Sequence, residues 1–181
     1  MTARTLSTLV ATAQTAVGAE FALLYTPTAD DRLEIVASAG RLVAPATTAV
    51  EPEETYAGMV LGSQQPVAMQ VRAGDQRVRA ETALIGHGPS ALCYVPCVGD
   101  AEVRGVLALL DKAGGGGFDF DDVEIATMLA EVAGTALEER DDSTESPSPE
   151  TLGRMLENLA TNDPGRYAQV ATLVEMVLAS G

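Results

Sequence analysis

The sequence predicts an α+β fold in which an antiparallel sheet packs against helices from both ends of the chain. Five strand-like segments lie between residues 20 and 112, and the turn sequences TADD and GDAE join two pairs of neighbours into hairpins. Amphipathic helical segments precede the first strand and follow the last one. Strands joined by tight turns are antiparallel, which argues against a doubly wound parallel sheet. The 181 residues, 46% of them hydrophobic, suit one domain with appendages and a sizeable core.

The chain begins with a helix and a hairpin. Residues 5–17 carry apolar side chains at spacings of three and four, and Gly18 ends this helix. Strands 20–27 and 32–40 follow, and alternation in the second leaves one of its faces partly exposed to water. Residues 41–54 are expected to be irregular because two prolines interrupt them.

The middle of the chain supplies the remaining strands. We expect, in order, a short helix at 55–61, a strand at 66–71, a long connection at 72–89 with a helical turn at 78–84, and strands at 90–98 and 103–112. Asp119 can cap the next helix. The apolar stripe of this helix consists of Ile125, Leu129, Val132 and Ala136, and Met128 and Leu137 widen it.

The composition changes near residue 140 and predicts three parts of the chain. Residues 1–140 form the α+β domain, residues 141–149 form an acidic linker rich in serine and proline, and residues 150–181 form two amphipathic helices in a hairpin. The apolar stripes of the hairpin either fold back on the chain's own domain or dimer mate, or dock on a partner protein.

The net charge of −15 argues against a nucleic-acid partner, because phosphates are bound by clustered lysine and arginine. No apolar stretch approaches the roughly 20 residues that a membrane span needs, and the N-terminal residues lack the apolar centre of a signal peptide. Two cysteines do not make a disulfide framework. These features predict a cytoplasmic protein without a membrane partner.

The order of the elements resembles that of a GAF domain, a small-molecule sensory module of signalling proteins. The matching phrases are AQTAVGAEFALLYTPTADDRLEIVASAG, YAGMVLGSQQPVAM, SALCYVPCVGDAEVRGVLALLDK and FDFDDVEIATMLAEVAGTALEE, which together span about residues 5–140. The resemblance implies a six-stranded antiparallel sheet with the terminal helices on one face and a ligand pocket on the other. It also implies a sensory or regulatory role, without catalysis, in which a small-molecule effector is bound.

Two further expectations follow from the resemblance. The tentative wall of the effector pocket consists of Tyr56, Met59, Val67, His87 and Cys93. Terminal helices often form a parallel dimer bundle in such proteins, so a homodimer is expected. Either the Leu6, Val10 and Val17 stripe or the Ile125, Leu129 and Val132 stripe can serve the dimer, but one of them must cover the sheet.

Resemblance to particular GAF domains leaves three other chemistries open. Lys112, Phe118 and Asp122 match part of a cyclic-nucleotide phrase, but we interpret Lys112 and Asp122 as a structural ion pair that joins the last strand to the last helix. His87 precedes the Val-Pro strand, roughly where some redox- and gas-sensing relatives place a haem ligand. No cofactor is assigned on this basis.

The third alternative is a reductase of the free methionine sulfoxide type, which uses cysteine as its nucleophile. Cys93 and Cys97 are the two cysteines, and Pro96 between them argues against a helix. On an extended strand their Cα atoms lie about 13 Å apart, whereas a disulfide needs about 7 Å or less. We therefore interpret them as small buried residues on one face of a strand.

Overall fold

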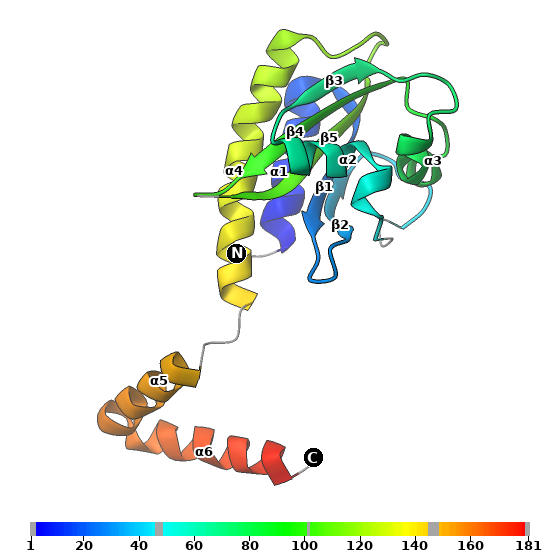
Figure 1. Ribbon diagram of the computed structural model, residues 1–181. Coiled ribbons are helices and arrows are strands. Elements are labelled where there is room, and N and C mark those ends of the chain that lie inside the picture. The colour runs from blue at the N-terminus through cyan, green and yellow to red at the C-terminus, as the bar shows by residue number, and fades with distance from the viewer. Residues whose placement is uncertain (1–2, 46–48, 101, 145–148, 180–181) are drawn as a thin grey trace. The chain divides into compact units, whose positions relative to one another are not determined.

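The computed structural model describes residues 3–45, 49–100, 102–144 and 149–179, and the chain divides into two compact units, Met1–Asp142 and Ser143–Gly181. Figure 1 shows the elements of both units. The first unit contains, in order, α1 (Ala3–Val17), β1 (Ala19–Pro27), β2 (Leu33–Ala39), the 3-10 turn η1 (Pro52–Glu54), α2 (Tyr56–Ser63), β3 (Val67–Gln70), the 3-10 turn η2 (Gln76–Val78), α3 (Arg79–Ile85), β4 (Ala91–Val98), β5 (Val103–Lys112) and α4 (Phe120–Thr144).

The predicted antiparallel sheet is confirmed, with its strands in the order β2-β1-β5-β4-β3. Both predicted hairpins are present, and β1 pairs with β5 so that the hairpins lie side by side. The expectation of six strands is wrong, because the described residues form five. In the segment between β2 and η1, only Val50 forms a bridge among the described residues, and its partner is Leu33 of β2. Pro45 interrupts this segment, and proline lacks the N–H that a ladder of hydrogen bonds requires.

The sheet separates two apolar cores, as the alternation of side chains along a strand requires. Leu24 and Leu107 belong to the core beneath α1 and α4, whereas Leu23 and Tyr94 belong to the core beneath α2 and α3. Figure 1 shows the two terminal helices together on one face and the two short helices on the other. The predicted placement of the terminal helices is therefore confirmed.

Helix α4 meets the sheet through small residues. Ala126, Ala130 and Ala133 are fully buried in the core beneath α1 and α4. A Cβ atom added to Gly134 would lie 2.1 Å from the carbonyl oxygen of Val98, so the helix backbone approaches β4 at a distance that only glycine allows. Over these turns the face of α4 carries only small side chains, and the larger Leu137 joins the same core one turn further on.

Three larger apolar residues of α4 lie on another side of the helix. Ile125, Met128 and Val132 are spaced by three and four residues, and we call them the α4 stripe. Met128 is 63% exposed and Val132 is 55% exposed. The sequence left open which stripe covers the sheet. In the structure α1 covers it with its Leu6 and Val10 stripe, and α4 covers it with alanines and Leu137.

An ion pair joins the last strand to the last helix of the first unit. Lys112 Nζ lies 2.5 Å from Asp122 Oδ1 and also donates to the carbonyl oxygen of Val17, at 2.8 Å. Asp122 and Asp119 exchange side-chain to backbone hydrogen bonds at the start of α4, each 3.0 Å long. The lysine therefore ties together β5, α4 and the end of α1.

The second unit contains α5 (Pro149–Asn162) and α6 (Pro164–Ala179), which form the two helices expected at 150–181. Asp163 caps α6 by accepting a hydrogen bond from the Arg166 N–H at 3.0 Å. Of the linker expected at 141–149, residues 141–144 continue α4 and Pro149 begins α5, whereas residues 145–148 lie outside the described residues. None of the described helices is long and apolar enough to span a bilayer.

Candidate functional site

A buried carboxyl group lies beneath α3, in the core that faces α2 and α3. Glu81 has no exposed surface, and its Oε1 atom accepts hydrogen bonds from the hydroxyls of Tyr25, at 2.6 Å, and Tyr94, at 2.8 Å. Burial, followed by the nearby charge of Glu81, raises the pKa of both tyrosines well above the ordinary value. The second oxygen, Oε2, is buried and has no hydrogen-bond partner among the described residues.

A second polar group, formed by Tyr56 and Asp75, lies next to the Glu81 group. The Tyr56 hydroxyl donates to Asp75 Oδ2 at 2.7 Å, and the Tyr56 and Tyr94 ring centroids are 6.3 Å apart. The hydrogen bonds from Tyr56 and from the Arg77 N–H lower the pKa of Asp75, and the bond to Asp75 raises the pKa of Tyr56. The guanidinium of Arg77 lies 5.5 Å from the centroid of the Tyr56 ring, a cation–π distance.

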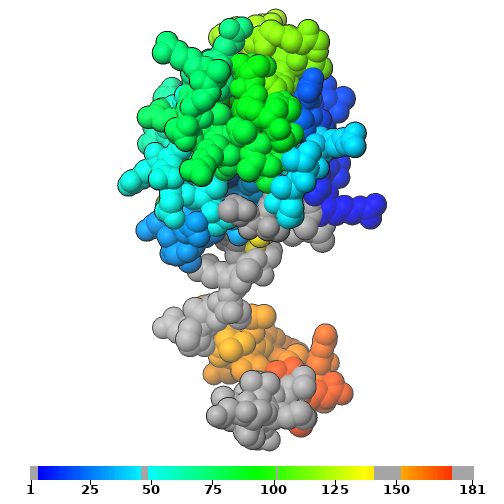
Figure 2. Space-filling model, turned by 90° about the vertical axis from the view of Figure 1, so that its right-hand side faces the viewer, coloured from blue at the N-terminus to red at the C-terminus, as the bar shows by residue number. Residues whose placement is uncertain are grey.

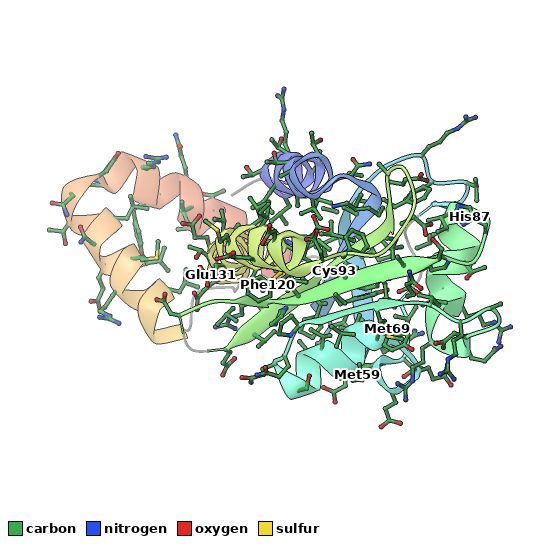
Figure 3. The ribbon with its side chains drawn as sticks, turned by 90° about the horizontal axis from the view of Figure 1, so that it is seen from above. Met59, Met69, His87, Cys93, Phe120 and Glu131 are labelled. Atoms are coloured by element: carbon green, nitrogen blue, oxygen red, sulfur yellow. The ribbon has the colours of Figure 1, made fainter. Side chains whose placement is uncertain are left out.

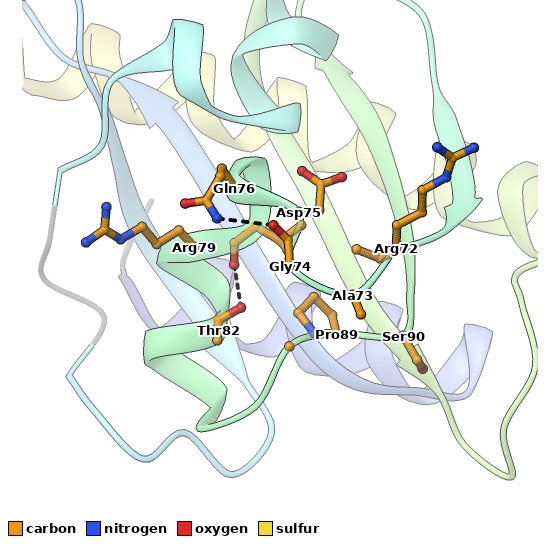
Figure 4. Close-up of a pocket in the computed structure, with 12 residues that line it drawn as sticks. Arg72, Ala73, Gly74, Asp75, Gln76, Arg79, Thr82, Pro89 and Ser90 are labelled. Atoms are coloured by element: carbon orange, nitrogen blue, oxygen red, sulfur yellow. Dashed lines mark hydrogen bonds between the residues drawn. The ribbon is translucent and has the colours of Figure 1, made fainter.

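Open hollows flank α3 on its solvent side. The first, of about 690 Å³, lies between the β3–α3 and α3–β4 connections. Its lining includes Asp75, Val78, Thr82, Gly88 and Ser90, and Figure 4 shows these two connections facing each other across it. The second, of about 360 Å³, is lined in part by α3 itself. Figure 2 looks onto this side of the first unit, where the green segments from β3 to β5 cover much of the surface.

Three of the five residues predicted for the pocket wall belong to this side of the sheet. Tyr56 is buried in the core beneath α2 and α3, and Val67 packs against that core from β3. Met59 is 38% exposed on α2, where its sulfur accepts a contact from Arg77 Nη1 at 3.9 Å.

Cys93 lies on the opposite face of the sheet, in the core beneath α1 and α4, so grouping it with Tyr56 is corrected by the structure. Figure 3 shows Cys93 and Met59 on the two sides of the sheet. Cys93 and Cys97 are fully buried and free, as small strand residues on one face. Burial raises the pKa of both thiols to about 12, which leaves almost no thiolate at neutral pH.

His87 lies in the connection between α3 and β4, with its side chain 53% exposed. Its Nδ1 atom is 3.8 Å from Asp111 Oδ2 and 3.2 Å from the Gly88 carbonyl oxygen, and its ring meets the edge of Phe21 at 6.0 Å. A haem site requires a wide apolar slot behind the axial ligand. The open, polar surroundings of His87 do not fit such a group.

The residues of the cyclic-nucleotide phrase have structural contacts. Lys112 pairs with Asp122, and its Nζ atom lies 5.8 Å from the centroid of the Phe118 ring. Phe118 packs against the core beneath α1 and α4, the core that does not contain Tyr56 and Glu81. These residues therefore hold α4 to the sheet and do not face the hollows around α3.

Sequence reasoning missed Glu81, Tyr25 and Tyr94. One signal was present, because Val78, Glu81 and Leu84 are spaced by three and place a carboxyl group on the inward side of the expected helical turn. The partners of Glu81 could not be found in this way, since Tyr25 is 56 residues away in the sequence.

The antiparallel sheet, with terminal helices on one face and short helices on the other, is the fold shared with solved GAF domains. The chain belongs to the GAF domain family, whose family model matches residues 2–137. GAF domains are sensory and regulatory modules, generally without catalysis. A comparison with curated protein sequences gave no match.

Solved structures that resemble the chain are GAF domains of signalling proteins. The GAF-B domain of DevS from Mycobacterium smegmatis is 22% identical, with a TM-score of 0.63, and the match covers 78% of this chain and 97% of that one. The GAF domain of an Acinetobacter phosphoenolpyruvate-protein phosphotransferase is 16% identical, with a TM-score of 0.64 and coverage of 78% and 84%. The GAF domain of a sensor histidine kinase from Bacillus halodurans is 10% identical, with a TM-score of 0.63 and coverage of 80% and 99%. At these identities the likeness establishes the fold alone.

Proposed function

We propose that this protein is a regulatory module without catalysis of its own, which binds a small-molecule effector beside α3 and transmits the binding to α4. The observation that carries the proposal is the buried group of Tyr25, Glu81 and Tyr94 beneath a short helix flanked by open hollows. Ligand sites typically have volumes of about 300–1,000 Å³ and combine apolar walls with a few directed polar groups. The larger hollow lies within this range of volumes, and Asp75, Thr82 and Ser90 supply polar groups in its lining.

Strand β4 supplies a path from the effector to α4. Tyr94 reaches Glu81 on one face of the sheet, whereas its neighbours Cys93 and Val95 lie in the core beneath α1 and α4. Because the interior is close-packed, a displacement of β4 changes contacts on both faces. Binding of the effector therefore changes the contacts between β4 and the alanine face of α4.

We propose that a second copy of the chain covers the α4 stripe. The stripe is apolar although the opposite side of the same helix is already buried, and an identical stripe on a second copy fits it about a two-fold axis. Glu124 and Glu131 flank the stripe, so a homodimer brings like charges together. Its affinity should therefore increase as added salt screens their repulsion.

The second unit is the proposed contact for a partner protein. Leu152 and Met155 on α5 and Tyr167 on α6 are exposed large apolar residues. A cytoplasmic location accompanies the proposal, because a reducing compartment keeps the two thiols free. Absence of catalysis is supported by the burial of both cysteines, which removes the nucleophile that a GAF-type reductase needs.

Effector binding is tested by screening a metabolite library for compounds that raise the melting temperature of the full chain, followed by calorimetric titration. Gly88→Trp places a large side chain in the hollow of about 690 Å³, where an added Cβ meets nothing closer than 4.0 Å. Gly62→Trp is the matched control, because Gly62 also has free space around it but does not line that hollow.

We expect Gly88→Trp to weaken effector binding at least tenfold and Gly62→Trp to leave it unchanged. The proposal is wrong if every compound that binds the wild-type chain binds both variants equally well.

A further inference from the structure

The hydrogen bonds of Glu81 are unevenly distributed over its two oxygens. Both tyrosine hydroxyls donate to Oε1, while Oε2 is enclosed by protein and accepts nothing from the described residues. None of the ion pairs formed by the described residues involves Glu81. A buried carboxyl oxygen without a donor is unfavourable, and native structures rarely retain one without a reason. Oε2 can therefore accept a hydrogen bond from a ligand.

The surroundings of Oε2 indicate what kind of donor is suitable. Tyr25 and Tyr94 bond to Glu81 directly, and the Tyr56 ring lies 6.3 Å from the Tyr94 ring, so aromatic side chains surround part of this carboxyl group. Aromatic rings attract cations through their negative faces, most strongly where water is excluded. A carboxyl oxygen with aromatic side chains nearby is suited to an ammonium group, which offers N–H donors and positive charge together.

Glu81 lies on the inner side of a short helix whose outer side borders both hollows. Arg79 and Thr82 line the larger hollow, while Ala80 and Ala83 line the smaller one. Helix α3 has seven residues and is one of the smallest elements of the sheet's α2 and α3 side. Glu81 itself lines neither hollow, so an effector in the larger hollow reaches Oε2 only when α3 is displaced.

We infer that the effector is a small organic cation with a protonated amino group, which donates to Glu81 Oε2 while the rest of the molecule occupies the hollow of about 690 Å³. This inference rests on the proposed function and specifies the ligand class for the same site. The net charge of −15 acts in the same direction, because it raises the local concentration of cations around the chain.

The test uses butylammonium as the probe, with butanol as its neutral analogue and butyrate as its anionic one. Each is titrated into the ¹⁵N-labelled full chain at pH 7, and amide shifts of residues 76–90 are followed. We expect butylammonium to shift these amides with an affinity at least tenfold higher than butanol, and butyrate to have no effect. Equal responses to butylammonium and butanol would overturn the inference.

Glu81→Gln keeps the shape of the side chain and removes its charge, so it should weaken butylammonium binding at least tenfold. Glu54→Gln is the matched control, because Glu54 borders the smaller hollow beside α3 and its loss should leave binding unchanged. Tyr94→Phe keeps the carboxyl group and removes one donor to Oε1, so it should bind butylammonium as tightly as the wild type or more tightly. Loss of binding in Tyr94→Phe would contradict the inference even if Glu81→Gln failed to fold.

The inference and the proposed function can fail separately. If a neutral or anionic effector binds and Gly88→Trp blocks its binding, the inference that the effector is a cation is wrong. The proposed effector site beside α3 is then still supported. Absence of any compound sensitive to Gly88→Trp would overturn the site itself.

Discussion

Gly134→Ala tests the close approach of α4 to the sheet. The added Cβ would lie 2.1 Å from the Val98 carbonyl oxygen and 2.4 Å from the Val98 carbonyl carbon, so two backbone segments must separate. Overpacking of this kind costs about 1–3 kcal/mol. Removing a helical glycine contributes about 1 kcal/mol in the opposite direction. Since the contacts are to backbone, we take the upper part of the range and expect a net loss of about 2 kcal/mol.

Gly62→Ala on α2 is the control, because its added Cβ meets nothing within 4 Å. It should be neutral or stabilising by up to about 1 kcal/mol. Thermal unfolding followed by tyrosine fluorescence reports on the first unit, which contains three of the four tyrosines. At about 2–4 °C per kcal/mol the two variants should differ by at least about 4 °C. Equal melting temperatures would refute the close-approach reasoning.

Three further predictions concern the thiols, the ion pair and the α4 stripe. Burial raises the pKa of Cys97 to about 12, so a thiol reagent should react slowly with the native chain. Its rate should be at least a hundredfold lower than with the chain unfolded in guanidinium. Equal rates would show that the strand opens readily. Burial by itself raises the pKa of Asp122, but the hydrogen bonds with Lys112 and Asp119 outweigh burial, so the pKa is lowered in the folded chain. The Lys112–Asp122 pair therefore stabilises the fold above the unfolded pKa of about 3.9. This stabilisation is lost as the pH falls through the lower pKa of the folded state. Lys112→Met should therefore lower the free energy of unfolding by roughly 1–3 kcal/mol at pH 7, with a smaller difference at pH 3, and a constant difference in denaturant titrations at both pH values would contradict this. Met128 is 63% exposed, and burying it in a dimer contributes about 1–2 kcal/mol per copy. Met128→Glu should therefore weaken the dimer at least tenfold, as measured by sedimentation equilibrium. A wild-type chain that is monomeric at 100 μM would refute the dimer.

The sheet and the terminal helices could be predicted because their signals are local. Periodic apolar residues mark α1, and turn sequences separate the strands of each hairpin. The orientation of α4 could not be predicted, because Ile125 and Ala126 begin apolar rows on two sides of one helix. The contact between Gly134 and Val98 decides which row meets the sheet, and that contact joins residues far apart in the sequence.

The candidate site was predicted only in part. Every residue of β4 from Ala91 to Cys97 is buried, so the alternation that normally assigns a residue to one face gave no contrast, and Cys93 was placed on the wrong side. Tyr56 was found through its place in the family's pattern. Glu81 was missed because its role depends on two tyrosines brought to it by the folded sheet.

Hydrogen–deuterium exchange of the full chain, with and without butylammonium, tests the central claim most directly. That claim is that a small molecule binds beneath α3 and that β4 transmits the binding to α4. We predict slower exchange in residues 76–90 and a change in α4, both lost in Glu81→Gln. Unchanged exchange in residues 76–90, or changes confined to α5 and α6, would contradict the account.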